Sequence, residues 1–204
     1  MNSARRGVPT PRRAAVIDMS VMPAPGSSEK SDQRRQAVLE AAVACFARKG
    51  FYGTTTNEIA ERAGISQPYV YRLFANKETL FAQAVFHVSE LMANTLAAHV
   101  SEAGPAPRPP EAALRAARSA YGALIQDRDV LRFLMHANCA ADEPLVGDAV
   151  RWCYAKQVAL VSELVGSDDE AVRRWFGAGM LENVTLALGL AGIDEPWART
   201  LSGH

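Results

Sequence analysis

The stretch Thr54–Phe81 (TTTNEIAERAGISQPYVYRLFANKETLF) decides the fold, because its apolar spacing and turn residues predict two short helices joined by a tight turn. Ile59 and Ala63 share one face of the first helix. Gly64 follows where that helix must end, since glycine adopts a left-handed conformation without a Cβ clash. Ser66 is then the expected cap of the second helix, because its hydroxyl can accept hydrogen bonds from free N–H groups of the first turn. This arrangement is a helix-turn-helix.

The second helix of this motif spans Ser66–Phe74 and is expected to enter the major groove of DNA while the first helix crosses the backbone. Its outward side chains can bond to base edges and phosphates, and they are Gln67, Tyr69, Tyr71 and Arg72. The pattern alone leaves a second interpretation open, which is a plain pair of packed core helices.

The longer string around the motif resembles the tetracycline-repressor (TetR) family of bacterial regulators. The resemblance implies an N-terminal helix-turn-helix domain and a C-terminal domain that holds a ligand pocket and forms a homodimer through its last helices. The matching residues are Gly50-Phe51, Thr54-Thr55, Ile59-Ala60, Ala63-Gly64-Ile65-Ser66, Tyr71, Phe74, Lys77-Glu78 and Leu80.

The resemblance also implies particular DNA contacts. Lys77 resembles the phosphate-contacting lysine of the family, with a solvent-exposed lysine as the equal alternative on sequence alone. Members of the family usually carry His or Tyr where this chain has Leu73, so that phosphate contact does not carry over and Arg72 is the candidate substitute. The residues predicted to contact DNA are Thr54, Thr55, Ser66, Gln67, Pro68, Tyr69, Tyr71, Arg72 and Lys77.

Outside the motif, apolar residues at helical spacing predict further helices and no strands, so the expected class is all-α. The expected domains are a helix-turn-helix DNA-binding domain and a helical ligand-binding and dimerisation domain, at 31–77 and 78–204. Residues 1–30, rich in Pro and Arg, are expected to be a disordered basic arm. The expected helices outside the motif are 31–49, 78–102, 111–126, 128–140, 144–165 and 168–190.

Capping residues predict where some of these helices begin. Ser31 is a plausible cap of the first helix. Thr55 and Glu58 have the spacing of a capping box, with Thr54 as the alternative cap. A stiff proline-rich loop is expected at 104–110.

Charge is distributed unevenly along the chain, although the net charge of its 204 residues is zero. The segments 1–29, 30–81 and 82–204 carry +2, +3 and −5. A basic N-terminal part and an acidic C-terminal part are typical of a protein whose N-terminal part faces nucleic acid.

Several classes of protein are disfavoured by what the sequence lacks. It has no run long enough to span a membrane and no secretory signal, so a cytoplasmic location is expected. It has no nucleophile elbow, phosphate loop, zinc motif or convincing carboxylate pair, so neither an enzyme nor a cofactor or metal is expected. The three cysteines have no metal-type spacing and are expected to be small buried hydrophobes: Cys45, Cys139 and Cys153.

The predicted ligand pocket is a set of aromatic, apolar and amide side chains in the C-terminal half. His136 and Asn138 are the polar pair expected to orient a ligand, with satisfied helix-interior polar groups as the alternative. For most of the others, plain core is an equally good interpretation. The pocket candidates are Phe86, Met92, Tyr121, Ile125, Phe133, His136, Asn138, Trp152 and Trp175.

The last two long helices are predicted to form a four-helix contact between two subunits, as the resemblance implies. The residues expected at that contact are Trp175, Phe176, Gly179, Met180, Asn183 and Val184. The predicted function is therefore a homodimeric repressor that a small molecule releases from a palindromic operator. The alternatives are a DNA-binding regulator without a small-molecule effector, controlled by a protein partner, or an activator.

Overall fold

A computed structural model describes residues 29–102 and 110–203, and within these ranges every regular element is a helix. This confirms the predicted all-α class. The disordered arm predicted at 1–30 lies almost wholly outside the described residues, as does the loop predicted at 104–110. The helices are α1 (Glu29–Gly53), α2 (Thr56–Arg62), α3 (Gln67–Leu73), α4 (Lys77–Glu102), α5 (Pro110–Ile125), α6 (Arg128–Cys139), α7 (Pro144–Leu164), α8 (Asp169–Leu188) and α9 (Pro196–Ser202), with a short 3₁₀ turn, η2 (Leu190–Gly192).

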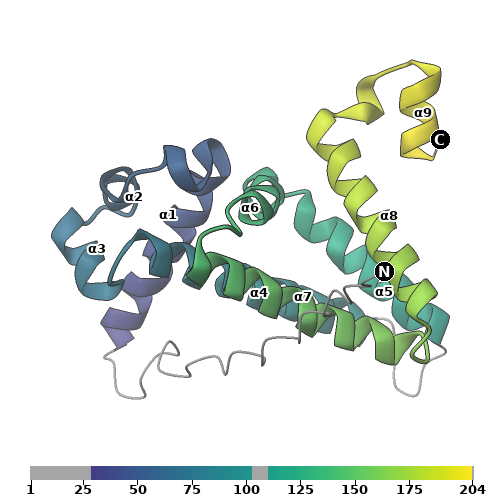
Figure 1. Cartoon of the computed structure of the whole chain (residues 1–204), viewed down its shortest axis with the longest axis horizontal. Coiled ribbons are helices and arrows are strands. Elements are labelled where there is room, and N and C mark those ends of the chain that lie inside the picture. Colours follow the sequence, from purple (N-terminus) through teal and green to yellow (C-terminus); the bar gives the residue numbers. More distant parts are fainter. Residues whose placement is uncertain (1–28, 103–109, 204) are drawn as a thin grey trace, which may run out of the picture.

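Helices α1, α2 and α3 form a headpiece at one end of the molecule (Figure 1). The predicted turn is present, because Gly64 has φ +67° and ends the run of α2. Thr55 is the N-cap of α2 and forms a full capping box with Glu58. That outcome resolves the choice between Thr54 and Thr55, since the side chain of Thr54 bonds elsewhere, to the carbonyl oxygens of Cys45 and Gly50.

The first helix departs from its prediction at both ends. Glu29 and Lys30 are already helical, so Ser31 is not its cap. The helical run continues to Gly53 across a kink at Gly50, whose backbone has φ 69° and ψ −177°. Gly50 ends the regular part of the helix as expected, but the residues after it, up to Gly53, are helical again.

A long second part of the molecule lies behind the headpiece. Helices α4 and α7 run alongside each other, α5 packs on α4, and α8 rises from the far end of α7 toward α9 (Figure 1). Asp168 caps α8 by accepting hydrogen bonds from two backbone N–H groups. Gly189, in the left-handed conformation, ends it. The last helix, α9, was not predicted, because its seven residues are too few to show a periodic pattern.

An aromatic cluster joins the headpiece to α4 and α6. The rings of Phe46 and Phe51 on α1 contact Phe81 on α4, and Phe81 contacts Phe133 on α6 at 5.0 Å between centroids. Phe46, Phe81 and Phe133 have no exposed surface. Their burial contributes about 2–3 kcal/mol each, which makes the headpiece and α6 one continuous core.

The described residues include no helix that is both long and apolar enough to cross a membrane. They also include no cluster of three or more His, Cys, Asp or Glu side chains able to hold a metal ion. The prediction that all three cysteines are buried is wrong for Cys139, which is exposed near the end of α6, while Cys45 is half-buried and Cys153 is buried.

Candidate functional site

Helix α3 presents the outward face that the sequence predicts for contact with DNA. Val70 anchors it in the headpiece core, with 1% of its surface exposed. Tyr71 and Arg72 are exposed, as are Ser66 and Pro68 at its start. Ser66 occupies the N-cap position, but its hydroxyl makes no capping hydrogen bond, contrary to the prediction. That hydroxyl is therefore free to meet a phosphate or a base.

A hydrogen-bonded chain fixes two of the outward side chains against α2. The Gln67 amide donates to the Thr56 hydroxyl at 2.9 Å, and the Tyr71 hydroxyl lies 2.9 Å from the same oxygen. Thr56 thus holds both side chains in place on the outward face of α3. The sequence analysis did not select Thr56, which is the residue directly after the cap and has no periodic signal of its own.

Tyr69 lies between two guanidinium groups. Arg34 of α1 and Arg72 of α3 stand 5.6 and 5.2 Å from the centre of its ring. Arg34 also donates to the Tyr69 hydroxyl at 3.4 Å. Cation–π contacts of this kind contribute about 0.5–1 kcal/mol at exposed sites. Arg34 was not among the residues predicted to contact DNA. Through this cluster it adds a positive charge to the outward face.

Lys77 is engaged within the protein, which neither sequence interpretation anticipated. Its ammonium donates to the carbonyl oxygens of Phe51 and Thr54, at 3.0 and 3.4 Å, and lies 4.4 Å from the centre of the Phe51 ring. Thr54 has 1% of its surface exposed, so its hydroxyl is not available to DNA. These two residues hold the loop between α1 and α2 in place.

Thr55 and Glu58 shape the exposed start of α2. The carboxylate of Glu58 accepts hydrogen bonds from Lys49 and from the backbone of Thr55, and these bonds lower its pKa to about 2. The carboxylate is therefore ionised at neutral pH and is part of the capping box. In this structure Thr55 acts first as a helix cap.

Arg35 ties α3 to α1 and α4. Its guanidinium donates to the Leu73 carbonyl at 2.9 Å and to Gln83 at 3.1 Å, and it stacks on the Phe74 ring at 4.3 Å. Burial lowers its pKa, in part offset by Asp32. The end of α3 is thereby locked to the long helix α4.

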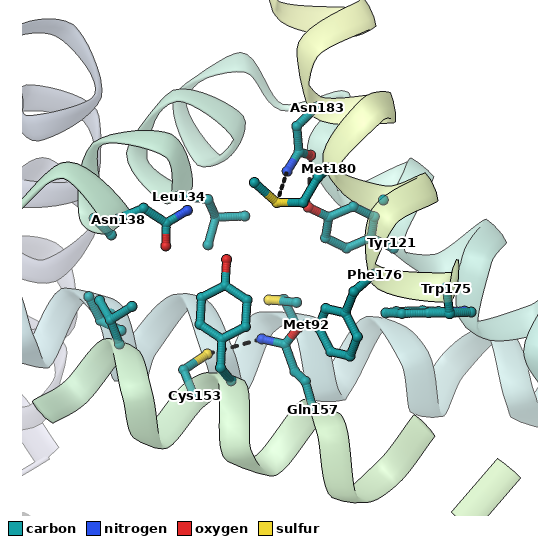
Figure 2. A pocket seen from close by; sticks show the side chains of 15 residues that line it. Met92, Tyr121, Leu134, Asn138, Cys153, Gln157, Trp175, Phe176, Met180 and Asn183 are labelled. Carbon is teal, nitrogen blue, oxygen red and sulfur yellow. Dashed lines mark hydrogen bonds between the residues drawn. The ribbon is translucent and has the colours of Figure 1, made fainter. Parts of the chain in front are cut away.

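Two adjoining cavities lie behind the headpiece, between α4, α5, α6, α7 and α8. The inner chamber measures about 60 Å³ and the outer chamber about 300 Å³. The two cavities are adjacent, since four residues line both of them: Met92, Tyr121, Gln157 and Trp175. Figure 2 shows the inner chamber, with Asn138 entering from α6, Gln157 from α7 and Asn183 from α8.

Both chambers are mainly apolar, and they differ in the polar groups that they carry. The inner one carries amide, phenol and thiol groups, and the Tyr121 hydroxyl donates to Asn183 Oδ1 at 2.7 Å (Figure 2). Burial raises the pKa of Tyr121, so the phenol stays neutral. The outer chamber is lined mainly by aliphatic side chains, including Leu96, Leu124, Leu160, Val161 and Leu164.

The predicted pocket residues divide into two groups. Met92, Tyr121, Asn138 and Trp175 line the inner chamber. The other five lie elsewhere: Phe133 and Ile125 are core, Phe86 and Trp152 pack edge to face on each other, and His136 lies against Gly50 of α1.

Gln157 lines both chambers but was not among the predicted pocket residues. It shares a face of α7 with Cys153 and Val161 at intervals of four residues, and that spacing could have indicated it.

The residues predicted at a subunit contact mostly face inward. Trp175, Phe176, Gly179, Met180 and Asn183 all line the inner chamber, and Met180 is also partly exposed. The residue spacing predicted correctly that these side chains share one face of α8. It did not predict that this face lines the cavity of the same chain. The outward stripe of α8 is instead Gly177, Leu181, Val184 and Leu188, which repeat at intervals of four, three and four residues.

Comparison with known proteins identifies the headpiece. The family of "Bacterial regulatory proteins, tetR family" matches residues 38–84, which contain α2, α3 and their flanks. The headpiece is therefore a DNA-binding domain of the TetR family. The curated relatives and solved structures that the chain resembles are described as regulators of transcription.

Characterised TetR-family relatives include both a repressor and an activator. The chain is 36% identical over 76 residues to the HTH-type transcriptional repressor AcnR of Corynebacterium diphtheriae, covering 37% of this chain and 40% of that protein. It is 28% identical over 175 residues to the HTH-type transcriptional activator FasR of Mycolicibacterium smegmatis, covering 85% of this chain and 74% of that one. The chain thus spans less than half the length of AcnR.

Solved structures of this TetR-family fold extend into the second part of the chain. A putative transcriptional regulator from Saccharomonospora viridis, in complex with choline, superposes with a TM-score of 0.62 at 16% identity. The superposition covers 85% of this chain and 93% of that one. At this identity the likeness shows the shared fold alone.

Proposed function

We propose that the chain acts as a homodimer that holds a palindromic operator and releases it when a small molecule occupies the cavity behind the headpiece. The observation that carries this proposal is the position of α6. One face of α6 lines the inner chamber through Leu134, Ala137 and Asn138. Its other face packs on α1 through Phe133 and His136.

Helix α6 gives the cavity a direct route to the headpiece. His136 lies against Gly50, at the kink of α1, and Tyr52 beyond that kink bonds to Glu143 at the N-cap of α7, which raises the pKa of Tyr52. A ligand that displaces α6 therefore acts on both sides of the kink. The long helix α4 is a second route, because it also packs on α1. The contacts of α1 favour α6 as the main path, with α4 supporting it.

The headpiece contacts with DNA stay a prediction, with a revised set of residues. Ser66, Gln67, Pro68, Tyr69, Tyr71 and Arg72 form the proposed groove-facing surface, with Arg34 added to it. Thr55 lies at its edge. Thr54 and Lys77 support this surface through the contacts that they make inside the protein.

A dimer supplies the second headpiece that a palindromic site requires. The outward stripe of α8 is the proposed contact, because Leu181 and Val184 are 41% and 38% exposed and Leu188 is 60% exposed. Val158 on α7, the helix before it in the chain, is 41% exposed as well. An exposed apolar stripe on α8, with α7 beside it in the sequence, fits a four-helix contact between copies.

A sizing experiment tests the dimer. Leu181→Asp is expected to convert a dimer into a monomer at micromolar concentration and to weaken operator binding. Leu145→Asp is the matched control, since Leu145 is equally exposed on α7 but lies off the stripe. A wild-type monomer, or an unchanged Leu181→Asp dimer, would contradict the proposed contact.

Operator release tests the second half of the proposal. Fluorescence anisotropy of a labelled operator should fall on addition of a molecule that binds the cavity. A molecule that binds there and leaves operator affinity unchanged would exclude release, and would favour control by a protein partner. Whether release raises or lowers transcription depends on where the operator lies, which is consistent with a repressor and an activator among the relatives.

A further inference from the structure

The inner chamber contains three side-chain N–H donors that lack a good acceptor. Gln157 donates to the thiol sulfur of Cys153 at 3.1 Å, and Asn183 donates to the thioether sulfur of Met180 at 4.0 Å. Sulfur is a weak acceptor. The indole nitrogen of Trp175 is buried and has no hydrogen-bond partner within the described part of the chain. The indole nitrogen of Trp175 and the amide of Asn183 are buried, Gln157 is half-buried, and such donors gain free energy when an oxygen acceptor reaches them.

The orientation of the Asn183 amide is fixed by its neighbour. Its oxygen accepts from the Tyr121 hydroxyl at 2.7 Å, so its nitrogen is the group left for a ligand (Figure 2). Gln157 reaches the same chamber from the opposite side, on α7 (Figure 2). The inner chamber is therefore lined by amide donors from both α7 and α8.

The charges around the two chambers disfavour a cationic ligand. Among the described residues that line them, none is an aspartate or a glutamate, and the one charged lining residue is Lys156. The guanidinium of Arg118 stands 4.5 Å from the centre of the Trp175 ring, so a cation already occupies a face of that aromatic group. Burying any charge without a partner is costly, and the nearby cations Lys156 and Arg118 add repulsion for a cation but attraction for an anion.

The outer chamber sets the size and character of the rest of the ligand. Its volume of about 300 Å³ corresponds to about ten water molecules, and hence about ten non-hydrogen atoms. Leu96, Leu124 and Leu164 are among its aliphatic walls. An apolar body fills such a space at the least desolvation cost.

We propose that the effector is a neutral or anionic molecule of about ten non-hydrogen atoms, with an acceptor oxygen at one end and an apolar body. The oxygen lies in the inner chamber against Gln157, Trp175 and Asn183, and the body lies in the outer chamber. This inference rests on the proposed function, because it assigns a chemical class to the effector of that cavity.

Three matched probes test the class: octanoate, octanamide and octylamine. Each has an eight-carbon chain, and only the first two carry an acceptor oxygen. Binding is measured on the protein without DNA, by calorimetry and by the rise in melting temperature. We expect octanoate and octanamide to bind and octylamine to bind at least about tenfold more weakly. Octylamine binding as tightly as octanoate, or no binding of any probe at about 10 mM, would overturn the inference.

Two variants test the placement of the oxygen. Trp175→Phe removes the indole N–H and keeps an aromatic ring, and Gln157→Met removes the amide at nearly constant length. Each should weaken octanoate and octanamide about fivefold, the effect of one lost hydrogen bond. Each variant is first checked for cooperative unfolding, and either one that folds suffices. Wild-type affinity for octanoate in the folded variants would overturn the placement.

Lys156→Gln is a further control, because Lys156 lines only the outer chamber, where the apolar body is placed. It should leave the affinities for octanoate and octanamide unchanged, and a selective loss of octanoate affinity would place the carboxylate in the outer chamber and overturn the placement. Failure of this inference is distinguishable from failure of the proposed function. If none of the oxygen-bearing probes binds but a different molecule releases the operator, the proposed function stands and the proposed chemical class of the effector is wrong. If octanoate binds without releasing the operator, the chemical class stands and the proposed release is wrong.

Discussion

At the kink of α1, replacing Gly50 with alanine is expected to lower the stability of the protein strongly, although it adds only one methyl group. Gly50 has φ 69° and ψ −177°, a combination that is essentially confined to glycine. A Cβ built at this position lies 3.1 Å from Nδ1 of His136. Gly50→Ala therefore adds a backbone strain of about 1–3 kcal/mol and forces the imidazole on α6 to shift by a few tenths of an ångström.

The expected loss is about 2 kcal/mol of unfolding free energy, which lowers the melting temperature by about 4–8 °C for a chain of this size. Thermal and urea unfolding of the purified protein measure it. Gly64→Ala is the matched control, because Gly64 also has a left-handed φ of +67° but no atom lies within 4 Å of an added Cβ. That variant should lose only about 1 kcal/mol.

The pair Gly50→Ala and His136→Ala separates strain from contact. Removing the imidazole should restore only the part of the loss that comes from the close approach, and the backbone strain should remain. A Gly50→Ala protein that melts within about 1 °C of wild type would refute the strain argument. A loss no greater than that of Gly64→Ala would show that the kink and the α6 contact add nothing.

Four further variants test the cap of α2, the electrostatics and the DNA-facing surface. Thr55→Ala removes the N-cap of α2 and should cost about 1 kcal/mol in unfolding free energy by urea titration; an unchanged midpoint would exclude the capping role. Glu58→Gln removes a carboxylate whose pKa falls from 4.5 to about 2 on folding, so wild type should lose stability as pH falls from 4.5 toward 2 and the variant should lose less over that window. Burial is the main cause that lowers the pKa of His87, so its contribution to stability is present above the ordinary histidine pKa of about 6.5 and is lost as pH falls below it. In His87→Leu the melting temperature should therefore depend less on pH between about pH 7 and 5. A pH dependence equal to that of wild type would assign the effect to other groups. Arg72→Gln should weaken DNA binding with little change of sequence preference and reduce the salt slope by about one, and an unchanged slope would remove Arg72 from the phosphate contacts.

The headpiece could be predicted from the sequence because its signals are local. Gly64, Thr55 and Glu58 act through backbone conformation and hydrogen bonds within a few residues, and the structure has them as predicted. The all-α class and the approximate bounds of α4 to α8 followed from apolar spacing. The capping hydroxyl of Ser66 was the local exception.

The role of Lys77 could not be predicted, because its partners are distant in the chain. Its ammonium bonds to carbonyl oxygens of Phe51 and Thr54, which lie 26 and 23 residues earlier. A sequence shows that a lysine is present at the start of a helix. It does not show which carbonyl groups the folded chain brings to it.

The cavity was the least predictable feature for the same reason. Phe133 and Tyr121 are both aromatic residues on apolar helices, yet Phe133 is packed into the aromatic cluster and Tyr121 lines the chambers. Which of the two faces an open space depends on how α5, α6 and α8 cross. The same holds for Asn183, which was expected at a subunit contact and lies at the inner chamber.

The central claim is that a dimer of this chain reads an inverted repeat through α3. Selection of bound sites from random duplex DNA, followed by affinity measurements at two salt concentrations, tests it most directly. We predict an enriched inverted repeat with half-sites about one or more helical turns apart, and affinity that falls steeply with salt. A single unpaired half-site, or no enriched sequence with weak binding at both salt concentrations, would contradict the account.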